Sequence, residues 1–179
     1  MTQITLAVTG SISAYKAADI TSQLTKLGFE GKVLMTPAAR KFITPLTLQV
    51  LSKNQVGLDV MMEDDPQRIE HINIGKETDL FLVAPASANT IAKLAMGLAD
   101  NMVTSTALAL PQTTKKLLAP AMNTKMLEHP ATQRNLKLLQ DYGYQIIQPR
   151  DAVLACGDKG AGALAPVETI VEAVKENCL

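Results

Sequence analysis

The chain has 179 residues, of which 47% are hydrophobic and none is tryptophan, which is enough for one well-buried core and too few for two ordinary domains. We therefore expect a single domain over residues 1–179. Lysine and arginine total 17, as do aspartate and glutamate, so the formal net charge is zero. A neutral chain lacks the one-sided field of proteins that bind nucleic acid or an anionic membrane, and we expect a small-molecule ligand instead.

The N-terminal segment and the cysteines bear on location and redox state. The first apolar run, Ile4 to Val8, has the size of a strand and is too short for a signal or membrane segment, so we expect a cytoplasmic protein. The two cysteines, Cys156 and Cys178, are too few for a disulfide framework or a structural zinc site. We therefore expect reduced thiols and no metal.

Short apolar runs alternate with helical segments along the chain. The β-rich or apolar runs predict strands at 4–8, 32–35, 79–84, 115–119 and 145–147. Apolar residues at helical spacing predict helices at 13–27, 88–98, 101–110, 132–142 and 167–177. Strands that alternate with helices typically form a parallel sheet covered on both faces. The predicted fold is a single-domain, doubly wound α/β domain, Rossmann-like or flavodoxin-like, with helices on both faces of the sheet.

Small and polar residues follow three of the predicted strands. Gly10, Ser11 and Ile12 lie between the first strand and the first helix, where glycine allows close backbone approach and free helix N–H groups attract phosphate. The GxGxxG spacing of dinucleotide folds is lacking, and a plain helix cap explains a lone Gly-Ser turn about as well. Thr36 follows the second strand, and the hydroxyl-bearing segment 85–90 follows the third. Three such loops at one sheet edge favour a mononucleotide.

The segments PAMNTKM and LACGDKGAGALAP hold candidate chemical groups. Asn123 and Met126 directly follow an apolar strand, where open α/β sheets place their ligand-binding loops. Cys156 lies among glycines, a composition that favours a mobile substrate lid at about 150–165 over a packed core. Each group also has an ordinary alternative, since asparagine caps helices, methionine fills cores and cysteine is often a small buried hydrophobe.

The two histidines lie in different surroundings. His71 is in a polar segment interleaved with apolar residues, where a surface or helix-capping histidine is the commoner case. Its imidazole can accept a proton near neutral pH, which makes it a candidate base. His129 precedes Pro130 at an expected helix start and is interpreted as structural.

Taken together, GSISAYK, His71, PASANT, PAMNTKM and LACGDKGAG resemble the flavin-containing cysteine decarboxylase family, in the same order and over nearly the whole chain. Leu127 stands where that family often has tryptophan. The chain most resembles the branch that acts in coenzyme A biosynthesis. The resemblance implies a lyase that decarboxylates 4'-phosphopantothenoylcysteine to 4'-phosphopantetheine, redox-neutral overall, through a thioaldehyde and an enethiolate.

The resemblance also implies a cofactor, residue roles and an assembly. It implies FMN bound by Gly10, Ser11, Ile12, Thr36, Ser87, Ala88, Asn89, Thr90 and Ala121. His71 would take the substrate thiol proton, Asn123 would orient the carboxylate, and Cys156 would protonate the enethiolate. Met126 and Ala155 would complete the substrate contacts. The expected assembly is a homotrimer, or a dodecamer built from trimers, with active sites between subunits.

Three other functions are weighed against this one. Oxidative decarboxylation of a peptide's C-terminal cysteine would use His71 and Asn123 but needs no lid thiol, so Cys156 counts against it. Flavin prenyltransferases of related fold generally lack the PxMNxxM pattern. Regulatory subunits that bind a protein phosphatase carry long acidic tails, which this sequence does not show. The presence of His71, Asn123 and Cys156 in one chain therefore favours a catalytic function.

Overall fold

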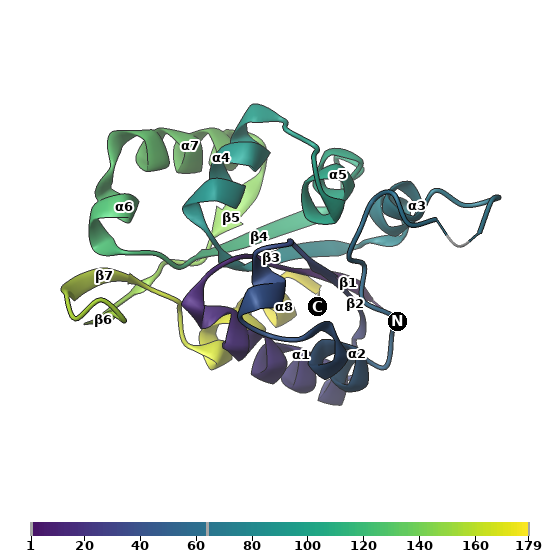
Figure 1. Cartoon of the computed structure of the whole chain (residues 1–179), viewed down its shortest axis with the longest axis horizontal. Helices are drawn as coiled ribbons and strands as arrows, with labels where there is room; N and C mark the ends of the chain where they lie inside the picture. The colour runs from purple at the N-terminus through teal and green to yellow at the C-terminus, as the bar shows by residue number, and fades with distance from the viewer. Residues whose placement is uncertain (1, 64, 179) are drawn as a thin grey trace.

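The computed structural model describes residues 2–63 and 65–178 and has a central five-stranded sheet (Figure 1). Its strands are β1 (Gln3–Val8), β2 (Glu30–Met35), β3 (Leu80–Ala86), β4 (Lys115–Pro120) and β5 (Tyr144–Ile146). They lie in the order β2-β1-β3-β4-β5, and every neighbouring pair is parallel. The predicted parallel sheet is confirmed, and each predicted strand coincides with an observed one to within two residues.

Helices cover both faces of the sheet, which confirms the doubly wound arrangement. On one face, below the sheet in Figure 1, lie α1 (Ala17–Lys26), α2 (Pro45–Ser52) and α8 (Val167–Cys178). On the other lie α3 (Glu70–Glu77), α4 (Ala88–Met96), α5 (Met102–Leu108) and α7 (Pro130–Asp141). No helix among residues 2–63 and 65–178 combines the length and the apolar character needed to cross a membrane.

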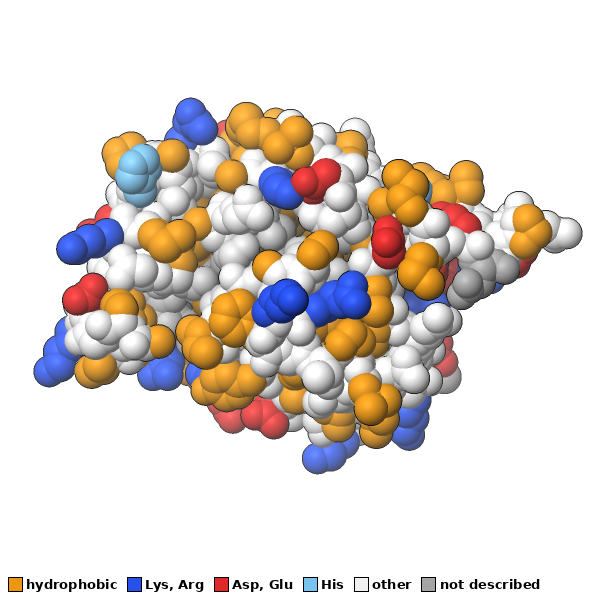
Figure 2. All heavy atoms as spheres, viewed as in Figure 1, with side chains coloured by type: hydrophobic (Ala, Val, Ile, Leu, Met, Phe, Trp, Pro, Cys, Tyr) orange, Lys and Arg blue, Asp and Glu red, His pale blue; other side chains and the backbone are white. Residues whose placement is uncertain are grey.

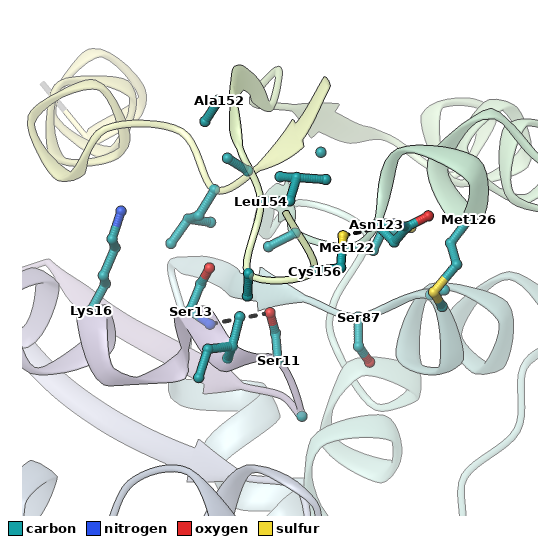
Figure 3. Close-up of a pocket in the computed structure, with 18 of the residues that line it drawn as sticks. Ser11, Ser13, Lys16, Ser87, Met122, Asn123, Met126, Ala152, Leu154 and Cys156 are labelled. Carbon is teal, nitrogen blue, oxygen red and sulfur yellow. Dashed lines mark hydrogen bonds between the residues drawn. The ribbon is translucent and has the colours of Figure 1, made fainter. Parts of the chain in front are cut away.

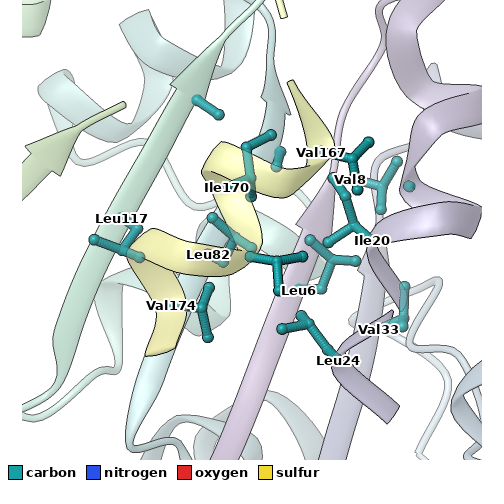
Figure 4. Close-up of a cluster of buried hydrophobic side chains, with 14 of the residues drawn as sticks. Leu6, Val8, Ile20, Leu24, Val33, Leu82, Leu117, Val167, Ile170 and Val174 are labelled. Carbon is teal, nitrogen blue, oxygen red and sulfur yellow. The ribbon is translucent and has the colours of Figure 1, made fainter. Parts of the chain in front are cut away.

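Two hydrophobic clusters hold these layers together. Successive side chains of a strand point to opposite faces, so each strand supplies both clusters. Leu6 belongs to the cluster that includes Ile20 of α1 and Ile170 of α8 (Figure 4). Phe81 belongs to the cluster on the other face, with Ile91 of α4. Because both of its faces are buried, the central strand β3 is apolar at every position rather than at alternate ones.

The helices differ from the prediction in two ways. The helix predicted at 13–27 is divided, because residues Ile12–Lys16 form a 3-10 helix, η1, before α1 begins. The short helices α2, α3 and α6 (Thr124–Glu128) were not predicted. They have eight, eight and five residues, so each is too short for hydrophobic periodicity to give more than a weak signal. The structural role expected for His129 is confirmed, since its side chain accepts the Ala131 N–H and caps α7.

The predicted lid region is an antiparallel hairpin of β6 (Arg150–Val153) and β7 (Lys159–Ala163). The hairpin is fastened to the loop after β4, since Met122 N–H donates to Gly162 O at 2.9 Å and Thr124 Oγ1 donates to a β7 carbonyl at 2.6 Å. Gly162 has φ +136°, and a Cβ there would overlap the Met122 carbonyl oxygen. Close packing therefore explains this glycine, whereas the mobility of the segment stays a prediction.

Candidate active site

A cavity of about 470 Å³ lies between the carboxyl ends of β1, β3 and β4 and the β6–β7 hairpin (Figure 3). The chain connections reverse direction between β1 and β3, and open α/β sheets bind their ligands at such a switch point. The volume is in the range typical of small-molecule sites. The fold thus places a pocket where two of the three predicted ligand-binding loops, those after β1 and β3, meet.

The loop after β1 supplies Gly10, Ser11 and Ile12 to the lining. Ser11 Oγ accepts the Ser13 N–H at 3.3 Å and caps η1, so the plain capping role considered for this turn is present. A Cβ on Gly10 would press against the Cβ of Ala38, which shows how closely the loop packs on its neighbour. The turn therefore combines a structural cap with a position on the cavity wall.

One hydroxyl connects the loops after β1 and β3. Thr9 Oγ1 donates to Pro85 O at 2.6 Å and accepts the Ser87 N–H at 2.8 Å. Thr9 is completely buried, so water does not compete for these hydrogen bonds. The two loops that form this wall of the cavity are held at a fixed separation.

The start of α4 faces the cavity through Ser87 and Ala88. Ser87 Oγ accepts the Thr90 N–H at 3.2 Å and caps the helix. The N–H groups of Ala88 and Asn89 belong to the same first turn and have no carbonyl partner within the helix. Free N–H groups at the positive end of a helix attract anions, including phosphate.

The loop after β4 places Asn123 against the tip of the hairpin. Asn123 Oδ1 accepts the Lys125 N–H at 2.9 Å and caps α6. Asn123 Nδ2 donates to Cys156 Sγ at 3.2 Å and to Asp158 Oδ2 at 3.3 Å. Cys156 Sγ in turn donates to Asp158 Oδ2 at 3.5 Å. The amide and the thiol, which both line the cavity, therefore meet with the Asp158 carboxylate, although Asn123 and Cys156 are 33 positions apart in the sequence.

The exposure of the side chains decides two of the alternatives that the sequence left open. Met126 lines the cavity with 49% of its surface exposed, so it does not fill the core. Cys156 is exposed and also lines the cavity, as does Ala155, so this cysteine is not a small buried hydrophobe. Ala121 is buried and forms part of the cavity wall. The other thiol, Cys178, does not line the cavity, and its pKa is raised mainly by burial and to a smaller extent by the charge of Asp79.

Three residues predicted to bind the cofactor do not line this cavity. Thr36 is buried, and its Oγ1 accepts the Ala39 N–H at 3.2 Å where the 3-10 helix η2 (Ala39–Lys41) begins. Thr90 is also buried and gives its N–H to the Ser87 cap, whereas Asn89 is exposed on α4. In the single chain, the two threonines therefore stabilise their own turns.

His71 lies in the first turn of α3, far along the molecule from the hairpin (Figure 1), and does not line the cavity. Its Nδ1 is buried without a hydrogen-bond partner among the described residues, and Glu63 Oε1 lies 4.0 Å away. One chain therefore brings Asn123 and Cys156 together but does not bring His71 to them.

Two basic residues of the lining were not predicted. Lys16 ends η1 and Arg150 begins β6, and no acidic residue accompanies them in the lining described for this cavity. Within the part of the chain that the structure describes, neither forms an ion pair. Lys16 belongs to the GSISAYK segment, so its motif carried a usable signal, whereas no local pattern marks Arg150.

Comparison with known proteins identifies the family. A family model described as Flavoprotein matches residues 1–179. The chain belongs to the flavoprotein family. This flavoprotein is 63% identical over 174 residues to the probable phosphopantothenoylcysteine decarboxylase of Streptococcus mutans serotype c, covering 97% of each chain. It is 44% identical over 174 residues to the coenzyme A biosynthesis bifunctional protein CoaBC of Bacillus subtilis, and the match covers 97% of this chain and 42% of that protein.

Solved structures show the same fold over the whole flavoprotein. A PPC decarboxylase mutant complexed with pantothenoylaminoethenethiol matches with a TM-score of 0.90 and 31% identity, covering 98% of this chain and 97% of that one. The FMN binding protein AtHal3 matches with a TM-score of 0.86 and 31% identity over 98% and 95%. The peptidyl-cysteine decarboxylase EpiD matches with a TM-score of 0.79 and 27% identity over 98% and 99%.

The cavity of this flavoprotein has the groups that a flavin nucleotide requires. Gly10, Ala88 and Ala121 are small, which leaves room at the strand ends for a flat ring. The free N–H groups at the start of α4 suit a phosphate. Lys16 and Arg150 make the lining positive, which favours an anionic nucleotide. The residues present therefore fit the cofactor class of the family.

Proposed function

We propose that this flavoprotein is an FMN-dependent phosphopantothenoylcysteine decarboxylase, a lyase of coenzyme A biosynthesis. It converts 4'-phosphopantothenoylcysteine to 4'-phosphopantetheine and carbon dioxide without net oxidation. The contact of 3.2 Å between Asn123 Nδ2 and Cys156 Sγ carries the proposal, because it puts a carboxylate-binding amide beside a proton-donating thiol. The relative from Streptococcus mutans, matched over 97% of its length, supports the same activity.

FMN is the flavin that the relatives support, since AtHal3 is described as an FMN binding protein. In this chain the residues that would hold it are Gly10, Ser11 and Ile12 after β1, Ser87 and Ala88 at the start of α4, and Ala121 after β4. When bound, FMN supplies reversible hydride chemistry, which no side chain of the protein offers. The protein contributes binding, orientation and proton transfer.

Loss of the substrate carboxylate requires a place for the electron pair that is left behind. A thioaldehyde at the neighbouring carbon provides it, and decarboxylation then gives a delocalised enethiolate. Asn123 Nδ2 has two N–H donors at the cavity and is fixed by its cap on α6, so it is suited to orient the carboxylate. Met126, one turn along α6, covers the same place and excludes water.

Cys156 gives its proton to the carbon of the enethiolate. Without that proton the reaction stops at the enethiol, before the final reduction. One solved relative is a cysteine-to-serine mutant complexed with pantothenoylaminoethenethiol, which is an enethiol of this kind. The complex supports the assignment of a lid thiol as the last proton donor.

His71 would accept the substrate thiol proton in the site of a neighbouring subunit. We infer a homotrimer, or a dodecamer built from trimers, because His71 lies away from the cavity of its own chain. Figure 2 shows hydrophobic side chains in several groups on the surface. Ile12, Tyr15 and Phe42 line the cavity with 57%, 57% and 47% of their surface exposed. A neighbouring subunit would remove this apolar area from water.

Oxidative decarboxylation of a peptide's C-terminal cysteine is the second candidate, because EpiD, a peptidyl-cysteine decarboxylase, has the same fold. Such a reaction ends at the enethiol and needs no carbon protonation. The contact between Cys156 and Asn123 therefore favours the redox-neutral reaction.

Incubation of the purified, flavin-loaded protein with 4'-phosphopantothenoylcysteine tests the proposal, with products resolved by mass spectrometry and flavin absorbance followed in parallel. The expected result is loss of carbon dioxide alone, with the flavin oxidised at the end. Loss of carbon dioxide and two hydrogens would establish the oxidative reaction instead. A protein that binds FMN but changes neither substrate nor flavin would refute both.

A further inference from the structure

Asp158 has no role in the proposed reaction, although its carboxylate contacts both Asn123 and Cys156. Asp158 Oδ2 lies 3.5 Å from Cys156 Sγ and 3.3 Å from Asn123 Nδ2. We propose that Asp158 is a positioning residue for Cys156. Its carboxylate accepts the S–H of Cys156 and an N–H of Asn123, and so sets the direction of the thiol proton. The inference rests on the proposed function, because it takes Cys156 as the proton donor.

The backbone of the hairpin tip brings this carboxylate to the thiol. Leu154 N–H donates to Asp158 O, and Gly157 N–H donates to Leu154 O, each at 2.8 Å. Gly157 has φ +89°, a conformation that glycine adopts without strain. The tight turn between β6 and β7 therefore holds Cys156 and Asp158 side by side, where both side chains accept hydrogen bonds from Asn123 Nδ2.

The charge of Asp158 is not taken up by another group. Among the described residues Asp158 forms no ion pair, and its side-chain partners are Cys156 and Asn123. A hydrogen bond to an ionised acceptor is stronger than one between neutral groups, which matters for a donor as weak as S–H. The carboxylate is thus the acceptor best able to orient the thiol proton.

Packing alone would not orient this thiol. Cys156 is exposed at a turn, so its side chain has freedom that a buried cysteine lacks. Asn123 Nδ2 donates to the sulfur and Asp158 accepts the S–H, so the two partners use the acceptor and the donor of the thiol. Together they define both the place of the sulfur and the direction of its proton.

This arrangement couples carboxylate recognition to protonation. Asn123 Nδ2 has two protons, which go to Cys156 Sγ and Asp158 Oδ2. When the substrate carboxylate replaces the sulfur on one of them, the other stays on Asp158, which still accepts the S–H of Cys156. In the proton transfer the S–H bond of Cys156 breaks, a C–H bond forms at the enethiolate carbon, and the thiolate left behind regains a proton from water. Asp158 itself gains no proton in this sequence and acts through the position of the thiol.

Infrared spectroscopy of the flavin-loaded protein tests the contact without any turnover. In a Cys178→Ser background Cys156 is the single thiol of the chain. Its S–H stretching band moves to lower wavenumber when the S–H donates a hydrogen bond. We expect the band to move to higher wavenumber in Asp158→Ala and by a smaller amount in Asp158→Asn. Asp151→Asn, at an exposed position of β6 outside the cavity lining, is the matched control and leaves the band unchanged.

Product analysis tests the consequence. With 4'-phosphopantothenoylcysteine, Asp158→Ala is expected to raise the ratio of released enethiol to 4'-phosphopantetheine about tenfold, as loss of one charge-assisted hydrogen bond implies. Carbon dioxide release is expected to change less than twofold, because decarboxylation precedes the step that uses the thiol. Asp158→Asn, which keeps an oxygen acceptor of the same size, is expected to restore part of the product.

The outcomes separate this inference from the proposed function. An unchanged S–H band and an unchanged product ratio in Asp158→Ala would refute the positioning role. Faster hydrogen exchange at the Met122 amide in Asp158→Ala would mean that Asp158 holds the hairpin in place, because this amide donates to Gly162 O. That result would also refute the positioning role. If the wild type released no carbon dioxide, the proposed function would fail, while the band shift would still decide whether Asp158 orients Cys156.

Discussion

Replacement of Gly162 by alanine tests whether the hairpin must dock on the loop after β4 to complete the site. The new Cβ would overlap the Met122 carbonyl oxygen, and φ +136° is unfavourable for any residue with a side chain. The backbone strain costs about 1–3 kcal/mol. Loss of the Met122 N–H to Gly162 O hydrogen bond costs about 1 kcal/mol more. A total of about 2–4 kcal/mol lowers the docking equilibrium roughly 30- to 1,000-fold.

Hydrogen exchange at the Met122 amide measures this docking directly, because its N–H donates across to β7. We expect faster exchange in Gly162→Ala, together with more enethiol and less saturated product from the substrate. Flavin binding, followed by fluorescence, is expected to persist because the loops after β1 and β3 are untouched. Gly157→Ala is the matched control, since its φ of +89° imposes similar strain while no atom beyond the two neighbouring residues of the chain lies within 4 Å of the new Cβ. Unchanged protection of Met122 in Gly162→Ala would refute the reasoning.

Three further predictions concern charge, pH and the core. Lys16→Ala and Arg150→Ala are each expected to lower kcat/KM for the phosphorylated substrate about tenfold, because these cations of the cavity lining are placed to bind its phosphate. Steady-state kinetics should show no such loss for the unphosphorylated analogue, and an equal loss for both substrates would contradict this role. Burial raises the pKa of Tyr144, so the unfolded chain loses this proton first and stability falls as the pH rises above about 10. Urea unfolding at increasing pH should show a weaker decline in Tyr144→Phe, and an equal decline would contradict the assignment. Ile20→Ala, at a fully buried position, lowers the free energy of unfolding by about 2–5 kcal/mol, and a loss below 1 kcal/mol would show that the core closes around the gap.

The sheet was predictable because burial on both faces leaves a simple signal. Strands such as β3, in which every residue is buried, must be apolar throughout, and the sequence shows this directly. The short helices α3 and α6 give no comparable signal, because few of their residues are buried. The hairpin was also missed, since the spacing of its glycines reflects contacts with Met122 and Thr124, residues distant in sequence.

The candidate site was predictable where a motif lies at a strand end. Asn123, Met126 and Cys156 were each expected to act on or contact the substrate, and they line one cavity. Thr36 follows a strand in the same way, yet its hydroxyl turns into its own 3-10 helix. The place of His71 depends on the packing of α3 at the far end of the sheet, which no local pattern encodes. Strand ends can be inferred from sequence, whereas the direction of each side chain depends on tertiary contacts.

The double hydrogen bond of Thr9 has a consequence for ligand affinity. Because Pro85 and Ser87 are already tied to the end of β1, the cavity wall is organised during folding. A ligand that meets this wall therefore loses little free energy to the ordering of loops, and more of its contact energy appears as binding. The hairpin tip differs in that its side chains contact the loop after β4 through Asn123, so we expect any ordering of the tip on binding to involve these hydrogen bonds. Preorganisation in this protein is thus greatest in the wall formed by the loops after β1 and β3.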